Sequence, residues 1–389
     1  MSEKNNCAHL VQTQYAKQFG QHQLMVKSPG RINLIGEHTD YNLGFVLPAA
    51  IDKAIYIAIG KRADQTICLT AADLDQSIEA SLESLKPSDM QWPNYLLGIA
   101  DQLKKKGYSI GGFNAVVAGD VPLGAGLSSS AAVECATIFA LNELFELGIS
   151  KLDMVRLAQK AENEFVGLQC GIMDMFASMF GKKDSVIQLD CRSLEYHYMP
   201  FHQDGFQIVL LDTCVKHSLA STEYNTRRLE CEAGVAAIAK LYPEVKSLRD
   251  ASMDMVESIL AGGDIKVYQR CKFIVAEIAR LQAGCQDLVA GDIAAFGLKM
   301  FETHKGLSQE YEVSCSELDF LADYAKTQSA VIGARMMGGG FGGCTINLVR
   351  DAEVDNFIAG AAAAFKNRFQ QDLKSYIVAI GDGTSLINN

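Results

Sequence analysis

A glycine- and serine-rich loop at residues 122–132 constrains the fold of this chain most strongly. Residues 113–119 before it are apolar and β-branched and predict a strand, and the apolar positions of residues 131–147 after it recur at helical spacing. Glycines let a backbone approach an anion, and a helix start offers unpaired N–H groups to it. The segment therefore predicts a phosphate site in a mixed α and β domain, although serines at 128–130 that merely cap the helix explain it equally well.

Other phosphate and nucleotide motifs are excluded by their spacing. No Gly-Lys-Ser/Thr follows the loop, so it is not a lysine-bearing P-loop, and His-Arg-Asp and Asp-Phe-Gly of protein kinases are missing. Residues 338–343 contain a formal Gly-x-Gly-x-x-Gly, but it leads into a predicted strand at 345–349 and not into a helix. We interpret it as a tight glycine loop between strands, either beside a bound nucleotide or purely structural.

The pattern along the chain predicts two α+β domains. At 389 residues the chain is too long for one compact core. Residues 36–44 read as a loop, and residues 224–326 are mainly helical. We place the boundary near residue 200, which gives domains 1–200 and 201–389. Further strands are predicted at 25–35, 46–59, 186–189 and 207–211, and a further helix at 153–166.

Charge and composition exclude several classes of function. A formal net charge of −11 disfavours nucleic acid and anionic membranes as partners. No apolar run is long enough to span a bilayer or to form a signal peptide. The 11 cysteines are scattered without a Cys-x-x-Cys pair, which is typical of reduced, mostly buried thiols in the cytoplasm.

Three separated motifs resemble the GHMP family of small-molecule kinases. They are the serine-rich loop, Met-Gly-Gly-Gly-Phe-Gly-Gly-Cys at 337–344, and Gly-Arg-Ile-Asn-Leu-Ile-Gly-Glu-His-Thr-Asp-Tyr at 30–41. The last is similar to the signature of the galactokinase branch. The resemblance implies an N-terminal domain of the ribosomal protein S5 domain 2-like type and a ferredoxin-like C-terminal domain, with the active site between them.

The resemblance also implies the reaction, which is transfer of the γ-phosphoryl group of ATP to the C1 hydroxyl of galactose. Asp174 matches the family's catalytic aspartate, which accepts the proton of that hydroxyl, and Arg31 is expected beside it to balance charge. Ser130 and Glu162 match the ligands of Mg²⁺, a hard cation that takes few protein ligands. The ATP-binding loop would consist of Gly124, Ala125, Gly126, Leu127, Ser128, Ser129 and Ser130.

Sugar recognition needs fixed polar groups that the wrong isomer would leave unpaired. By resemblance, Glu37 and His38 hold the C6 hydroxyl and Asp40 holds the C3 and C4 hydroxyls. Tyr224 matches a further sugar contact from the second half. The expected sugar-binding set is completed by Thr39 and Gly171.

Several alternatives stay open. Trp92 either borders adenine or belongs to the core. An N-acetylgalactosamine kinase shares most of these motifs, and some galactokinase-like proteins are sugar sensors with little catalysis. Sensors have a shortened serine-rich loop, whereas Ser128-Ser129-Ser130-Ala131-Ala132 is complete here, which favours catalysis. By resemblance the chain is expected to be a cytoplasmic monomer.

Overall fold

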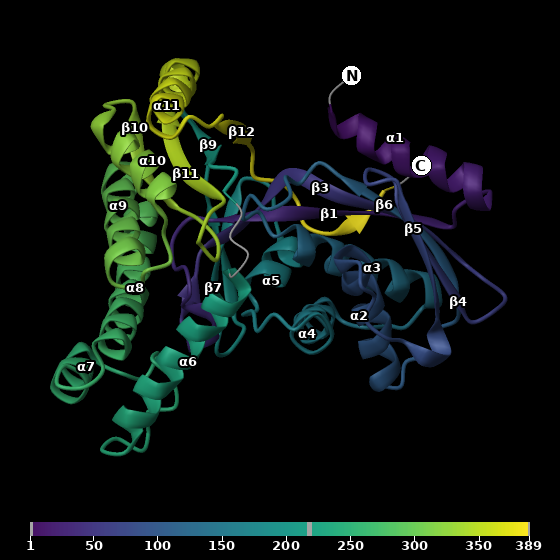
Figure 1. The fold of residues 1–389 in the computed structure, drawn as a ribbon, viewed down its shortest axis with the longest axis horizontal. Coiled ribbons are helices and arrows are strands. Elements are labelled where there is room, and N and C mark those ends of the chain that lie inside the picture. Colours follow the sequence, from purple (N-terminus) through teal and green to yellow (C-terminus); the bar gives the residue numbers. More distant parts are fainter. Residues whose placement is uncertain (1–2, 216–219, 388–389) are drawn as a thin grey trace.

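The computed structural model describes residues 3–215 and 220–387 and divides into a sheet layer with its own helices and a second, largely helical half (Figure 1). The first half is built on a six-stranded sheet in the order β13-β1-β3-β6-β4-β5. All neighbours in it are antiparallel except β4 and β6. Its strands are β1 (Leu24–Asn33), β3 (Pro48–Lys61), β4 (Thr66–Ala71), β5 (Gln76–Ser81), β6 (Phe113–Gly119) and β13 (Ser385–Leu386).

Helices cover both faces of this sheet because its central strands are apolar on both sides. In β3, Tyr56 and Ala58 pack on one face against Val11 and Tyr15 of the N-terminal helix, while Ile57 points into the core on the other face. Figure 1 shows α1 alone above the sheet and the other helices of this half below it. These helices are α1 (Glu3–Phe19), α2 (Gln91–Lys105), α3 (Ser129–Phe145), α4 (Lys151–Ala161) and α5 (Met173–Phe180).

The second half contains a four-stranded sheet in the order β10-β11-β9-β12. Alternation along β9 separates two cores: Ile208 and Leu210 face the first half, whereas Val209 and Leu211 face helices α10 and α11. The sheet therefore lies between the first half and helices α10 and α11 of the second half. Its strands are β9 (Phe206–Asp212), β10 (Val331–Met336), β11 (Cys344–Arg350) and β12 (Lys374–Val378), and its helices α10 (Ser316–Thr327) and α11 (Val354–Phe369).

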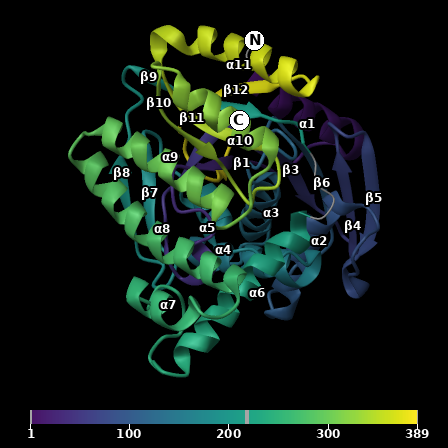
Figure 2. The ribbon, with the colours of Figure 1, turned by 60° about the vertical axis from the view of Figure 1, so that its left-hand side comes forward.

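The remaining helices form an arm seen beside the sheets in Figures 1 and 2. Helices α7 and α8 begin with side-chain caps, since Ser252 and Asp264 accept hydrogen bonds from the first backbone N–H groups. Among the described helices, none has the length and apolarity that a membrane span requires. The arm consists of α6 (Ala220–Ala239), α7 (Met253–Leu260), α8 (Ile265–Val289) and α9 (Ile293–Gln309), and a small sheet of β2 (Phe45–Val46), β7 (Ser185–Asp190) and β8 (Tyr196–Pro200) adjoins it.

The predicted strands and the long helical region are confirmed, but one predicted helix is partly wrong. The helix expected at residues 153–166 ends at Ala161 and continues as a π-helical turn over Glu162–Val166. Gly167, at φ +93°, donates its N–H to the Glu162 carbonyl five residues back, which widens the turn. The periodicity of apolar residues does not distinguish this turn from an α-helix.

Candidate active site

An open cavity of about 830 Å³ lies where the two halves meet. Most of the predicted site residues come together in it, although they are spread over almost 200 positions of the chain. They are Arg31, Glu37, His38, Asp40, Ser130, Glu162, Gly171, Asp174 and Tyr224.

Arg31 and Asp174 form a bidentate ion pair in this cavity. Arg31 Nε and Nη2 donate to the two carboxylate oxygens of Asp174 at 2.8 and 3.0 Å. Burial alone would lower the pKa of Arg31, but the nearby carboxylates, above all Asp174, raise it, so the guanidinium stays charged. The Arg31 side chain is 4% exposed and that of Asp174 28%, so the carboxylate is the partner that reaches the cavity.

The phosphate loop contacts the same ion pair. Arg31 Nη1 donates to the Gly126 carbonyl at 2.6 Å, and the Ser128 hydroxyl donates to Asp174 Oδ2. The prediction that the serines cap the helix is therefore wrong for Ser128, whose side chain makes no cap hydrogen bond although it occupies the cap position of α3. Its backbone lies in the left-handed region at φ 56°, which directs the hydroxyl to Asp174.

Ser130 and Glu162 face the cavity from α3 and from the start of the π turn. Glu162 is 4% exposed, and burial raises its pKa to about 7, with Asp174 raising it further and the Cys170 thiol lowering it. A buried carboxylate with so little positive charge near it fits a site that is completed by a cation. Among the described residues, no three His, Cys, Asp or Glu side chains gather as a metal cluster. A hydroxyl and a carboxylate, as Ser130 and Glu162 supply them, suit a hard cation that takes most of its ligands from phosphate and water.

Glu37 joins the two halves. Its Oε1 accepts hydrogen bonds from Arg335 Nη2 at 3.0 Å and from the Gly338 N–H at 2.8 Å. Arg335, on β10, is fully buried and also donates from Nε to the Leu34 carbonyl at 2.9 Å. Nothing local in the sequence marks this arginine as the partner of a residue 298 positions away.

His38 and Tyr224 form one wall of the cavity. Their rings lie 5.3 Å apart, and the Tyr224 ring also borders Gly339. Burial lowers the pKa of His38 to about 3, and the charge of Arg227 lowers it further. The imidazole is therefore neutral at physiological pH and carries a single proton.

Asp40 and Gly171 are in close contact. A Cβ at position 171 would lie 1.8 Å from Asp40 Oδ2, so only glycine allows the carboxylate this position. Burial raises the pKa of Asp40 to about 7, and the Asp174 charge contributes to the rise. Asp40 thus has few positive partners near it, which suits a carboxylate that binds hydroxyl groups.

Thr39 lies beneath the loop and not beside the cavity. It is fully buried, and its hydroxyl donates to the carbonyl oxygens of Gly36 and Phe45. Its contacts stabilise the turn that presents Glu37 and His38.

The glycine loop after β10 closes the cavity from the second half. Gly338, Gly339, Gly340 and Phe341 line it, and a Cβ at Gly338 would lie 3.1 Å from the Gly126 carbonyl of the phosphate loop. The predicted position between two strands is confirmed, because β10 ends at Met336 and β11 begins at Cys344.

A second, mostly apolar cavity of about 530 Å³ adjoins the phosphate loop. Trp92 lines it, and its indole Nε1–H is buried without a hydrogen-bond partner among the described residues. The ring also packs against the core of the first half, which confirms the core interpretation, whereas a contact with adenine stays a prediction. Nothing in the sequence marks the remaining apolar residues as parts of one cavity, because they come from five separate elements and from the loops after β4 and β6. They include Ile55, Leu74, Tyr95, Leu96, Val117 and Val133, while Ser129 and Ser130 are shared with the phosphate loop.

Family models match three parts of the chain. Residues 13–61 match the galactokinase galactose-binding signature, residues 94–182 the N-terminal domain of GHMP kinases, and residues 286–367 the GHMP kinase C-terminal domain.

Curated relatives and solved structures agree with these matches. The galactokinase of Roseiflexus sp. (strain RS-1) is 38% identical, with 97% of this chain and 96% of the relative covered. That of Clostridium acetobutylicum is 40% identical over 93% of this chain and 94% of its own. The structure of Lactococcus lactis galactokinase complexed with galactose superposes with a TM-score of 0.92 at 34% identity, covering 96% of this chain and 98% of that one.

Proposed function

The chain belongs to the galactokinase family of GHMP kinases, and from this premise we propose how it transfers the γ-phosphoryl group of ATP to the C1 hydroxyl of α-D-galactose. The observation that carries the proposal is the Arg31–Asp174 ion pair. It lies in the cavity between the loop at residues 36–44 and the phosphate loop. The products are galactose 1-phosphate and ADP.

Asp174 is the proposed catalytic residue. The C1 oxygen of galactose forms a bond to the γ-phosphorus, and the bond from that phosphorus to the bridging oxygen of ADP breaks. The hydroxyl proton passes to the Asp174 carboxylate. Arg31 orients this carboxylate through two hydrogen bonds and places positive charge beside the transferred group.

The sugar lies in the larger cavity in this proposal. Glu37 and His38 bind the C6 hydroxyl and Asp40 the C3 and C4 hydroxyls, while Gly171 and Tyr224 shape the pocket. Asp40 is 7% exposed, and its carboxylate would be left unpaired by a sugar without matching hydroxyls, which supports selectivity.

The nucleotide occupies the phosphate loop and the second cavity. Residues Gly124 to Ser130 contact the phosphates at the start of α3, and the base lies against Trp92 in the apolar cavity. Ser130 and Glu162 would hold the Mg²⁺ that accompanies ATP, and this ion neutralises charge on the phosphate oxygens when bound. A cytoplasmic location and a monomeric state belong to the same proposal and rest on family resemblance. The domain limits 1–200 and 201–389 are proposed from the pattern of strands and helices along the chain.

The experiment is a measurement of magnesium-dependent ADP release from ATP with galactose, N-acetylgalactosamine, glucose, mevalonate and homoserine, followed by NMR of the product. Galactose 1-phosphate as the dominant product supports the proposal. If N-acetylgalactosamine gave the dominant product, the chain would be an N-acetylgalactosamine kinase. Galactose binding without turnover of any acceptor would indicate a sensor and overturn the proposed catalysis.

A further inference from the structure

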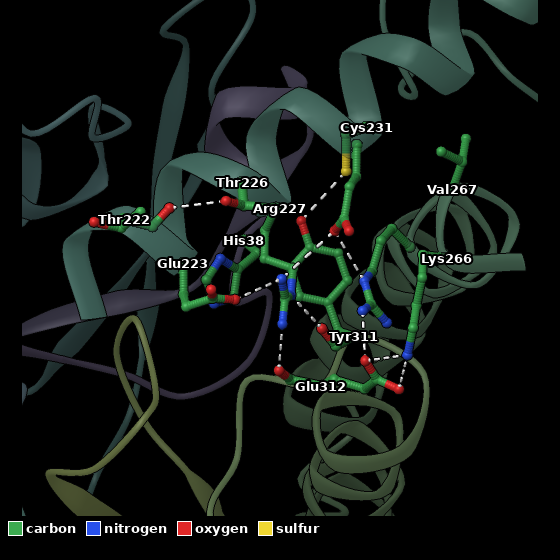
Figure 3. Close-up of polar contacts among 12 residues, drawn as sticks. His38, Thr222, Glu223, Thr226, Arg227, Cys231, Lys266, Val267, Tyr311 and Glu312 are labelled. Atoms are coloured by element: carbon green, nitrogen blue, oxygen red, sulfur yellow. Dashed lines mark hydrogen bonds and ion pairs between the residues drawn. The ribbon is translucent and has the colours of Figure 1, made fainter. Parts of the chain in front are cut away.

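A chain of hydrogen bonds runs from the sugar-site histidine into the helical half of the molecule. His38 Nδ1 lies 2.8 Å from the Tyr41 hydroxyl, which lies 2.8 Å from the Tyr311 hydroxyl. The Tyr311 hydroxyl in turn lies 3.3 Å from Cys231 Sγ. Figure 3 shows the last of these contacts, with Cys231 above the Tyr311 ring and His38 beside it. Three separate segments thus contribute to one largely buried polar chain.

The Tyr311 end of this chain is held firmly. Tyr311 is fully buried, and Arg227 donates from Nε to its carbonyl at 2.9 Å and from Nη2 to the Glu312 carbonyl at 2.8 Å. Arg270, 1% exposed, donates to the Glu312 carboxylate at 2.6 Å. The phenol of Tyr311 therefore has one well-defined position relative to Tyr41.

Every member of the chain keeps its proton near neutral pH. Burial raises the pKa of Tyr41 and of Tyr311 well above the ordinary value of a phenol, and burial raises the pKa of the Cys231 thiol to about 12. The neutral His38 ring has one N–H to place on either of its nitrogens. Two arrangements of protons are thus conceivable, in which the chain donates either toward the imidazole or away from it.

The chemistry of the two end groups favours donation toward His38. A phenol is a better donor, and a neutral imidazole nitrogen a better acceptor, than the reverse pairing. The Tyr41 proton then points at His38 Nδ1, and the Tyr41 oxygen is left to accept the proton of the Tyr311 hydroxyl.

We infer that Tyr41 and Tyr311, seated against Cys231, are positioning residues that hold His38 as its Nε2–H tautomer, so that the imidazole donates a hydrogen bond to a hydroxyl oxygen of the bound sugar. His38 Nε2 is buried, and no described group meets it with hydrogen-bond geometry, so it can turn to such a ligand. The Gly339 backbone lies near enough to raise the pKa of the ring, as a carbonyl facing an N–H does. The same hydroxyl can then donate its proton to the neighbouring Glu37 carboxylate. A hydroxyl oxygen that accepts from His38 and donates to Glu37 satisfies both side chains, whereas a hydrogen atom at the same position of the sugar satisfies neither.

The tautomer is measured directly, by NMR of the protein with ¹⁵N-labelled histidine and without sugar. The His38 signals are assigned by their loss in His38→Gln. We expect a protonated Nε2 and an unprotonated, hydrogen-bonded Nδ1 in the native protein. A His38 ring protonated at Nδ1 would overturn the inference. Because this spectrum needs no turnover, it remains decisive even if the proposed function on which the inference rests should fail.

Two conservative variants provide the second test. In Tyr41→Phe, which removes the group that donates to Nδ1, the His38 signals should shift toward a mixture of tautomers. The KM for galactose should rise about tenfold, the value of one lost hydrogen bond, with kcat nearly unchanged. The preference for galactose over 6-deoxygalactose should fall by a similar factor. Tyr311→Phe should show the same changes to a smaller extent.

Tyr198→Phe is the matched control. Its hydroxyl donates to the Phe180 carbonyl at 2.6 Å, away from both cavities, so the variant should leave the His38 signals and the KM unchanged. An unaltered His38 spectrum and an unaltered KM in Tyr41→Phe would contradict the inference. A KM increase without any change of tautomer would reduce Tyr41 to a packing role and would contradict it as well.

Discussion

Three hydrogen bonds converge on one carboxylate, that of Asp174. Arg31 supplies two of them and the Ser128 hydroxyl the third. These contacts orient the group toward the cavity without surrounding it, since 28% of the side chain stays exposed. At the scale of single residues, the proposed chemistry therefore depends on a carboxylate that is fixed in direction and accessible to a hydroxyl group.

We predict that Asp174→Asn lowers kcat by at least ~100-fold, the low end of the contribution of a general base. Galactose binding should change little, because the amide keeps the size of the side chain. Steady-state ADP release and calorimetric titration with galactose measure the two effects. Asp372→Asn, on a side chain that is 90% exposed, is the control and should behave like the native enzyme. Near-normal turnover in Asp174→Asn would exclude the assigned role.

At the scale of elements, helix α9 packs directly on strand β10 through two glycines. A Cβ at Gly297 would lie 2.0 Å from the Ile332 carbonyl, and one at Gly333 would lie 2.5 Å from the Cα of Gly297. This close approach places β10, and with it Arg335, against the loop at residues 36–44. The contact thus links the packing of a helix to the position of Glu37.

Gly297→Ala should therefore lower the free energy of unfolding by about 1–3 kcal/mol, the usual cost of overpacking. The KM for galactose should rise as well, because any shift of β10 displaces Arg335. Urea unfolding followed by circular dichroism measures the first effect. Gly262→Ala is the control, since its added Cβ would meet no described atom within 4 Å. Equal stability of the two variants would contradict the prediction.

At the scale of the whole molecule, the end of the chain returns to the first half. Strand β13 pairs with β1 at Val26 and Lys27, so the sheet of the first half includes residues from the C-terminus (Figure 1). Thr384 is 1% exposed, and its hydroxyl lies 2.8 Å from that of Ser28 and donates to the Ser178 carbonyl at 2.9 Å. The C-terminal segment is therefore held to the first half by strand pairing and by buried hydrogen bonds.

Removal of residues 381–389 should destabilise the first half by about 3 kcal/mol, because several buried hydrogen bonds of about 1 kcal/mol each are lost. A chain that ends at residue 387 keeps β13 and the hydrogen bond from Ile387 N–H to the Met25 carbonyl, and serves as the control. Thermal unfolding of both chains measures the difference. Equal midpoints would show that the C-terminal strand adds no stability.

The sequence by itself determined strands β1, β3, β6, β9 and β11, the long helical region and the family, because these depend on local periodicity and on motifs of a few consecutive residues. It also identified nine of the residues that line the cavity. The sequence did not predict the partners of two hydroxyl groups. Ser128 donates to Asp174 instead of capping α3, and Thr39 donates to the Gly36 carbonyl within its own loop.

Only the tertiary structure decided which distant groups meet. Arg335 is 298 positions from Glu37, and Tyr311 is 270 positions from Tyr41. No local pattern encodes such pairs, because they follow from how the second half packs on the first. The apolar cavity beside the phosphate loop is of the same kind, since its walls come from several elements. Local structure therefore follows from neighbouring residues, whereas buried polar contacts follow from the packing of whole faces, because a polar group that loses water must find a partner on the face that covers it.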